Sequence, residues 1–180
     1  MKIGVLSTID NPLLGYFLEE AYKNNLSDIS VFLDSKLSSQ KDMDIWNRRT
    51  IGSKFNDKSK IPKIYDLQSS EIPFYLVDNH NSNKAEALYK SLDIECLFNA
   101  GSPRKISQKI LDLMKFGVLN VHPGILPIYR GCSCVEWAIL NDDQIGNTAH
   151  LMDAGYDTGP IINIEKLSFP KNSNYVDIRV

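Results

Sequence analysis

An asparagine and a histidine stand two positions apart in the segment NVHPG (residues 120–124), at the end of a short apolar run. Residues two apart on a strand point to the same face. We therefore expect the amide of Asn120 and the imidazole of His122 to leave a strand end side by side. An imidazole exchanges a proton near neutral pH, and an amide N–H can stabilise an oxyanion.

A second polar segment, MDAGYDTGP (residues 152–160), lies between two strand-like runs, and its Asp157 follows His122 by 35 positions. A carboxylate beside the imidazole would orient it and stabilise its charged form. A donor, a base and a carboxylate together suffice for acyl transfer to an amine. Spacing alone leaves an alternative, in which Asn120 and Asp157 are turn residues and His122 is a hydrogen-bonded core histidine.

The composition is typical of one globular domain, with 180 residues of which 43% are hydrophobic and 23% charged. The net charge of −2 gives no overall attraction to nucleic acid. No apolar run suits a signal peptide or approaches the roughly 20 residues that span a bilayer, so we expect a cytoplasmic protein without a membrane partner. Cys132 and Cys134 are interpreted as packing residues of a helix rather than metal ligands, and no metal site is expected.

Apolar runs and polar punctuation predict the elements that must position these residues. We expect strands at residues 2–6, 29–33, 74–77, 94–98, 118–121, 148–152 and 161–167, and helices at 13–22, 42–50, 83–92, 107–116 and 135–140. This alternation predicts an α/β fold with a mostly parallel sheet. Ligands bind beyond the carboxyl ends of such strands, so the loop after Phe98 and the end at His122 should share one cleft.

The motifs NVHPGILPIYRG (residues 120–131) and MDAGYDTGPII (residues 152–162) resemble the N10-formyltetrahydrofolate-dependent formyltransferase family. The resemblance covers roughly residues 1–169 and is most specific from Leu97 onward. It implies a Rossmann-like, mostly parallel twisted sheet with helices on both faces. It also implies that Asn120, His122 and Asp157 are the catalytic residues. Residues 1–180 would then form a single catalytic domain, which we expect to be truncated at its C-terminal end because family members usually run longer.

The same resemblance implies that N10-formyltetrahydrofolate binds between the loop that follows Phe98 and the turn at residues 151–157. Small residues in such a loop let main-chain groups approach a flat heterocycle, although an ordinary strand-to-helix connection has the same composition. The residues expected to contact this cofactor are Phe98, Ala100, Gly101, Ser102, Pro103, Arg104, Ile106, Asp153 and Tyr156.

Within the family, the segments NAGSPR (residues 99–104) and RGCSCVEWAI (residues 130–139) look most like sugar-nucleotide N-formyltransferases. This similarity implies an amino deoxy sugar on a nucleoside diphosphate as acceptor, with dTDP-4-amino-4,6-dideoxyhexose expected, for O-antigen or other surface polysaccharide synthesis. The first loop, STIDN (residues 7–11), lacks the glycine cluster of a phosphate cradle, which counts against glycinamide ribonucleotide. Expected acceptor contacts are Arg48, Arg49, His80, Asn81, Tyr129 and Arg130.

Other interpretations remain for these residues and for the function. The arginines of segment 34–70 could be a solvated surface, His80 could serve loop and cap geometry, and His150 is interpreted as a packed strand histidine. A methionyl-tRNA formyltransferase would need a further RNA-binding domain and a basic surface, so no nucleic acid partner is expected. A formyltetrahydrofolate hydrolase could use the same three residues, and a non-catalytic binding module is a further alternative. The resemblance also allows a homodimer.

Overall fold

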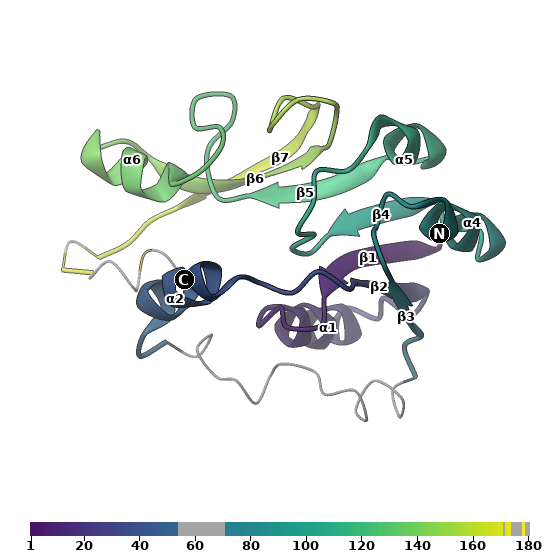
Figure 1. Ribbon diagram of the computed structural model, residues 1–180. Helices are drawn as coiled ribbons and strands as arrows, with labels where there is room; N and C mark the ends of the chain where they lie inside the picture. Colours follow the sequence, from purple (N-terminus) through teal and green to yellow (C-terminus); the bar gives the residue numbers. More distant parts are fainter. Residues whose placement is uncertain (54–70, 171, 174–177, 179–180) are drawn as a thin grey trace.

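The computed structural model describes residues 1–53, 71–170, 172, 173 and 178. Within them, seven strands form one sheet in the order β3-β2-β1-β4-β5-β6-β7, which Figure 1 shows from its lower to its upper edge. The strands are β1 (Ile3–Thr8), β2 (Ile29–Asp34), β3 (Phe74–Val77), β4 (Cys96–Asn99), β5 (Val118–His122), β6 (Ile145–Leu151) and β7 (Ile161–Leu167). Neighbouring strands from β3 to β5 are parallel, while β6 is antiparallel to both β5 and β7. The expected mostly parallel sheet is confirmed.

Five helices alternate with these strands in the described part of the chain: α1 (Leu14–Lys23), α2 (Gln40–Thr50), α4 (Asn83–Ser91), α5 (Gln108–Leu113) and α6 (Cys134–Leu140). Hydrogen bonds at the helix starts explain two of the boundaries. Ser39 and Asp42 form a reciprocal capping box before α2, and the Ser82 side chain accepts from the backbone N–H of Ala85 in α4. No helix among the described residues is long and apolar enough to cross a membrane.

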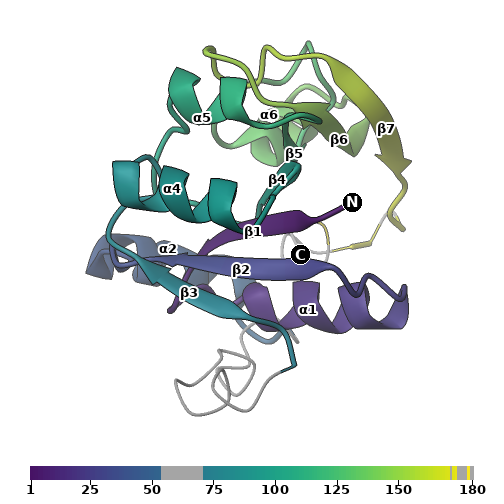
Figure 2. The same cartoon turned by 90° about the vertical axis from the view of Figure 1, so that its right-hand side faces the viewer.

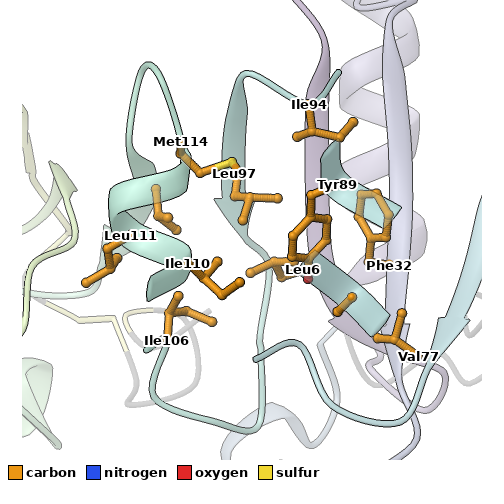
Figure 3. Packing of buried hydrophobic residues seen from close by; sticks show 12 residues of the cluster. Leu6, Phe32, Val77, Tyr89, Ile94, Leu97, Ile106, Ile110, Leu111 and Met114 are labelled. Carbon is orange, nitrogen blue, oxygen red and sulfur yellow. The ribbon is translucent and has the colours of Figure 1, made fainter. Parts of the chain in front are cut away.

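Helices cover both faces of the sheet, as expected. Successive strand residues point to opposite faces, so Val5 packs on the α1 side while Leu6 packs on the side of α4 and α5. Figure 2 shows α4 and α1 on the two sides of β1 and β2. In the larger cluster, drawn in Figure 3, Tyr89 of α4 meets Phe32 of β2 edge to face, with ring centroids 4.8 Å apart. The central strands are therefore packed on both faces.

Two expected segments fall partly outside the described residues. Of the polar excursion at 34–70, the structure describes α2, which begins two residues before the expected helix at 42–50, but not residues 54–70. The C-terminal end of the chain, where the resemblance predicted a truncated domain, also lies mostly outside them.

The register of the sheet brings three strand ends together. Asn99 at the end of β4 lies beside Asn120 of β5. On the other side of β5, His150 of the antiparallel strand β6 lies opposite Asn120, and Thr148 lies opposite His122. Paired residues on neighbouring strands point to the same face, so Asn99, Asn120 and His150 form one polar row.

Candidate active site

A cavity of about 320 Å³ lies between the loop that follows β4 and the turn that follows β6. We call residues 99–106 the donor loop and residues 152–157 the closing turn. At the rim, Nζ of Lys105 lies 4.6 Å from the ring centroid of Tyr156, so the two segments contact each other. The cavity is lined by Asn99, Ser102, Pro103, Arg104, Lys105, Asn120, His150, Met152, Asp153, Gly155, Tyr156 and Asp157. The loop after Phe98 and Asn120 of β5 thus line one cavity, whereas His122, which was expected to share it, is not among the lining residues.

The amide of Asn120 has partners on two sides. Its Oδ1 accepts from Nδ2 of Asn99 at 3.0 Å, and its Nδ2 lies 3.1 Å from Nε2 of His150. The other ring nitrogen of His150, Nδ1, is 2.9 Å from the carbonyl oxygen of Leu151 and must donate to it. In the neutral ring, Nε2 is then the acceptor for Asn120. The second amide N–H of Asn120 has no partner among the described residues, and Asn120 lines the cavity.

His122 is 4% exposed, and its two ring nitrogens have different neighbours. Nε2 lies 2.8 Å from the carbonyl oxygen of Tyr129, which can only accept, so this nitrogen carries a proton. Nδ1 faces Oδ2 of Asp157 at 3.5 Å. A second proton on Nδ1 would therefore give an imidazolium with an acceptor on each side. The thiol of Cys134 also lies beside Nε2, at 3.2 Å.

Asp157 joins the two histidines. Its Oδ2 accepts from the backbone N–H of Gly131 at 2.9 Å, and its Oδ1 lies 3.6 Å from Nε2 of His150. The residue adopts a left-handed backbone with φ of 53°, which aspartate tolerates better than most side chains. Two positions later, a Cβ on Gly159 would lie 1.9 Å from the carbonyl oxygen of Leu151. Glycine is thus required for the turn to pass close against β6.

An ion pair between the half-buried Arg104 and a buried carboxylate holds the donor loop. Arg104 donates two hydrogen bonds to the fully buried carboxylate of Asp34, from Nε at 2.7 Å and from Nη2 at 3.1 Å. Burial raises the pKa of Asp34, but the bonds from Arg104 and from the backbone N–H groups of Lys36 and His80 outweigh it, so the pKa lies below its ordinary value. The His80 ring is buried beside this pair, and its Nδ1 lies 2.8 Å from Oγ of Ser102.

The expected cofactor contacts divide into two groups. Ser102, Pro103, Arg104, Asp153 and Tyr156 line the cavity. The other four, Phe98, Ala100, Gly101 and Ile106, are not among the lining residues. The ring of Phe98 stacks on Phe17 at 4.6 Å, and Ile106 is 2% exposed in the core. The carbonyl oxygen of Ala100 accepts from Asn11 and Ser7, and Gly101 has φ of 90°. These four position the donor loop.

The six expected acceptor contacts all lie in the described part of the chain, and none is among the cavity-lining residues. His80 is 0% exposed, so the structure corrects its expected substrate contact. It is buried because both ring nitrogens bond within the protein, Nε2 to the carbonyl of Phe32 and Nδ1 to Ser102. Asn81 holds the donor loop through the carbonyl of Lys105 and the N–H of Ser107.

The other acceptor candidates have partners outside the cavity lining. Tyr129 presents its carbonyl to that histidine and its hydroxyl to Asp143, while the side chain of Arg130 is exposed. In α2, Nε of Arg48 donates to the carbonyl of Asp44, and Arg49 pairs with Glu136 of α6 at 3.3 Å.

Sequence reasoning missed the part that His150 takes in the site. The histidine is packed, as expected, being 1% exposed, but it also bonds Asn120 and lines the cavity. His150 reaches the site because the antiparallel pairing of β6 with β5 places it opposite Asn120. The spacing of residues within one segment does not reveal this pairing. Asn99, Lys105, Met152 and Gly155 were likewise not among the expected site residues.

Similarity to known proteins places this site in a family. The model of the family described as "Formyl transferase" matches residues 1–176. A methionyl-tRNA formyltransferase from Trichormus variabilis is 43% identical over 74 residues, which are 41% of this chain and 22% of that relative. The chain therefore matches about a fifth of the length of that protein.

Two solved structures share the fold over almost the whole chain. Glycinamide ribonucleotide transformylase 1 from Symbiobacterium toebii has a TM-score of 0.66 at 18% identity, covering 99% of this chain and 78% of its own. A sugar N-formyltransferase from Shewanella sp FDAARGOS_354 has a TM-score of 0.65 at 15% identity, covering 99% and 62%. At these identities the likeness supports the fold alone. Because the family model spans nearly all of the sequence, the chain belongs to the formyl transferase family.

Proposed function

We propose that this protein transfers a formyl group from N10-formyltetrahydrofolate to the primary amine of a nucleotide-linked amino deoxy sugar. The observation that carries the proposal is the grouping of Asn120, His122 and Asp157 at the end of β5, beside the cavity. An amide donor, an imidazole and a carboxylate together suffice for acyl transfer to an amine.

The donor would occupy the cavity between the donor loop and the closing turn. Its flat pterin would lie next to main-chain groups of the donor loop. The loop is held from behind by Asp34 and His80, so it offers a preformed surface. The formyl group would then lie near Asn120, which lines the same cavity.

In the reaction, the amine nitrogen attacks the formyl carbon, a C–N bond forms, and the carbonyl oxygen takes the negative charge. The second N–H of Asn120 is positioned to donate to that oxygen. One such donor lowers a barrier by about 3–4 kcal/mol. The bond from Asn99 and the contact to His150 mean that little reorganisation is needed when the charge develops.

The attacking amine must also lose a proton. His122 would accept it on Nδ1, because Nε2 already carries a proton that is donated to Tyr129. Asp157 stabilises the resulting imidazolium. The same proton then passes to N10 as the tetrahydrofolate leaves and the bond between N10 and the formyl carbon breaks.

For the acceptor, we propose an amino sugar carried on a nucleoside diphosphate, with dTDP-4-amino-4,6-dideoxyhexose as the first compound to test. The first loop supports this choice over a substrate with a terminal phosphate. Its Asn11 is bonded to Ser7 and to the carbonyl of Ala100, so side chains close the loop where a phosphate cradle would have glycine amides. Arg48 and Arg49 in α2 supply positive charge for a diphosphate.

A second candidate acceptor is methionyl-tRNA, because the relative that is 43% identical over 74 residues carries that name. Incubating the protein with formyltetrahydrofolate and, separately, nucleotide-linked amino sugars or methionyl-tRNA separates the two candidates. Mass detection of a formylated sugar nucleotide supports the proposal. Formylated methionyl-tRNA would replace the acceptor class, and release of formate without any formylated acceptor would indicate hydrolysis.

A further inference from the structure

A row of hydrogen bonds runs from the donor loop across the sheet to β6. The backbone N–H of Ser102 donates to Oδ1 of Asn99 at 2.9 Å, and Nδ2 of Asn99 donates to Oδ1 of Asn120 at 3.0 Å. Nδ2 of Asn120 then donates to Nε2 of His150, whose Nδ1 donates to the carbonyl of Leu151. Three side chains from three neighbouring strands thus form one directed chain.

Both ends of this chain are main-chain groups with a fixed role. The Ser102 N–H can only donate, and the Leu151 carbonyl can only accept. If one amide turned over, two donors or two acceptors would face each other at about 3 Å. The direction of every bond between the two ends is therefore determined. As a result, Nδ2 of Asn120, and not its oxygen, is the atom on the His150 side.

We propose that Asn99 is a positioning residue for the reaction, which sets the orientation of the Asn120 amide and links it to the place of the donor loop. This inference rests on the proposed function, in which an N–H of Asn120 stabilises the oxyanion. Asn99 donates to Asn120 and accepts from the backbone N–H of Ser102. It therefore connects the loop that would hold the formyl donor to the amide that would stabilise the transition state. An oxygen of Asn120 turned toward the oxyanion would repel it.

The substitution Asn99→Asp tests the orientation without changing the shape of the side chain. Its carboxylate still accepts from the Ser102 N–H, so the donor loop keeps its bond. The second carboxylate oxygen would face Oδ1 of Asn120, and the Asn120 amide is expected to turn so that its Nδ2 donates there. Loss of an oriented donor predicts a kcat that is about 30-fold lower, with the KM for formyltetrahydrofolate within about threefold of wild type.

Two controls separate positioning from a structural effect. Asn83→Asp makes the same chemical change at an exposed residue of α4 that bonds Lys109, and kcat should not change. In an Asn120→Ala background, Asn99→Asp should cause no further loss, because no amide remains to be oriented. If Asn99→Asp fails to fold, Asn99→Ala takes its place in the same comparison, with a lower kcat expected in the wild-type background only.

Nitrogen NMR of His150 gives a result that does not depend on turnover. In the wild type, Nε2 should show the shift of an unprotonated ring nitrogen at mildly alkaline pH. In Asn99→Asp, the turned Asn120 would present an oxygen to Nε2, and this nitrogen should become protonated, with Asp157 nearby at 3.6 Å. An unchanged His150 signal, an unchanged kcat, or an equal loss in the Asn120→Ala background would each overturn the proposal. Absence of formyl transfer in the wild type would instead reject the proposed function, and the NMR comparison would still decide whether Asn99 orients Asn120.

Discussion

Nδ1 of His122 and Oδ2 of Asp157 lie 3.5 Å apart, although the two residues are 35 positions apart in the chain. The same carboxylate oxygen accepts from the backbone N–H of Gly131, which fixes its direction. Because Nε2 of His122 donates to Tyr129, the unprotonated nitrogen is the one that faces the carboxylate. The arrangement is suited to an imidazole that gains a proton during the reaction.

Replacing Asp157 by asparagine should therefore lower kcat by about 100-fold or more, because the charge that stabilises the imidazolium is removed. The asparagine oxygen can still accept from the Gly131 N–H, so the fold should persist. Steady-state kinetics and circular dichroism check the two statements. A variant that keeps more than a tenth of the wild-type kcat would show that Asp157 is not required.

Removal of Asn120 or His122 should abolish most turnover and leave the sheet intact. Asn120→Ala removes the oxyanion donor, for which a loss of about 100- to 1,000-fold in kcat is expected. His122→Ala removes the base, with a similar expected loss. Donor binding, measured by calorimetry, should weaken much less than kcat in both variants. If either variant keeps more than about a tenth of the activity, a barrier change under 1.4 kcal/mol, its residue is not central.

A methyl group at Gly124 should displace the His122 ring while leaving all three proposed reacting side chains chemically unchanged. A Cβ there would lie 2.8 Å from the carbonyl oxygen of Tyr129 and 3.0 Å from Nε2 of His122. Since small displacements of positioned groups can cost about 100-fold in rate, Gly124→Ala should lower kcat by at least about tenfold. The comparison change Gly52→Ala adds a methyl group where nothing lies within 4 Å, although the φ of 77° at Gly52 strains the local backbone. Its kcat should be unchanged at a temperature at which circular dichroism shows both variants folded. Equal rates for both variants would contradict the expected contact.

The sequence predicted the order of helices and strands because apolar periodicity is a local property. It also predicted that Asn120 and His122 lie two positions apart at the end of one strand, as they do in β5. What it could not predict depends on pairing between distant segments. His150 enters the site through the register of β6 against β5, and Arg104 meets Asp34 across 70 positions. Local composition at His80 indicated a loop residue, whereas burial by neighbouring elements decides that it is closed to substrate.

The ion pair between Asp34 and Arg104 should make stability depend on pH. Asp34→Asn leaves a half-buried guanidinium without its carboxylate and should destabilise the fold by about 3 kcal/mol at neutral pH. The native pKa of Asp34 is lowered, so its contribution is complete above the unfolded pKa of about 3.9 and is lost as the pH falls through the lower native pKa. Denaturant unfolding of both proteins should show a difference near pH 7 that shrinks below about pH 4. A constant difference over this range would contradict the assigned role.

The last prediction concerns the arginines of α2. If Arg48 and Arg49 bind a diphosphate, replacing both by alanine should raise the KM of the sugar nucleotide by about tenfold or more, since charge-assisted bonds are lost. The KM for formyltetrahydrofolate should change little, because neither arginine lines the cavity.

Arg49 also pairs with Glu136 of α6 at 3.3 Å, so a purely structural role for that arginine must be separated from binding. Glu136→Gln makes this separation, because it removes the paired charge but keeps the guanidinium. Under phosphate binding, Glu136→Gln should leave the acceptor KM unchanged or lower it, since the arginine no longer divides its charge between two anions. If Glu136→Gln raises the acceptor KM as much as the double substitution does, the pair only joins α2 to α6. Diphosphate recognition would then have to come from other residues.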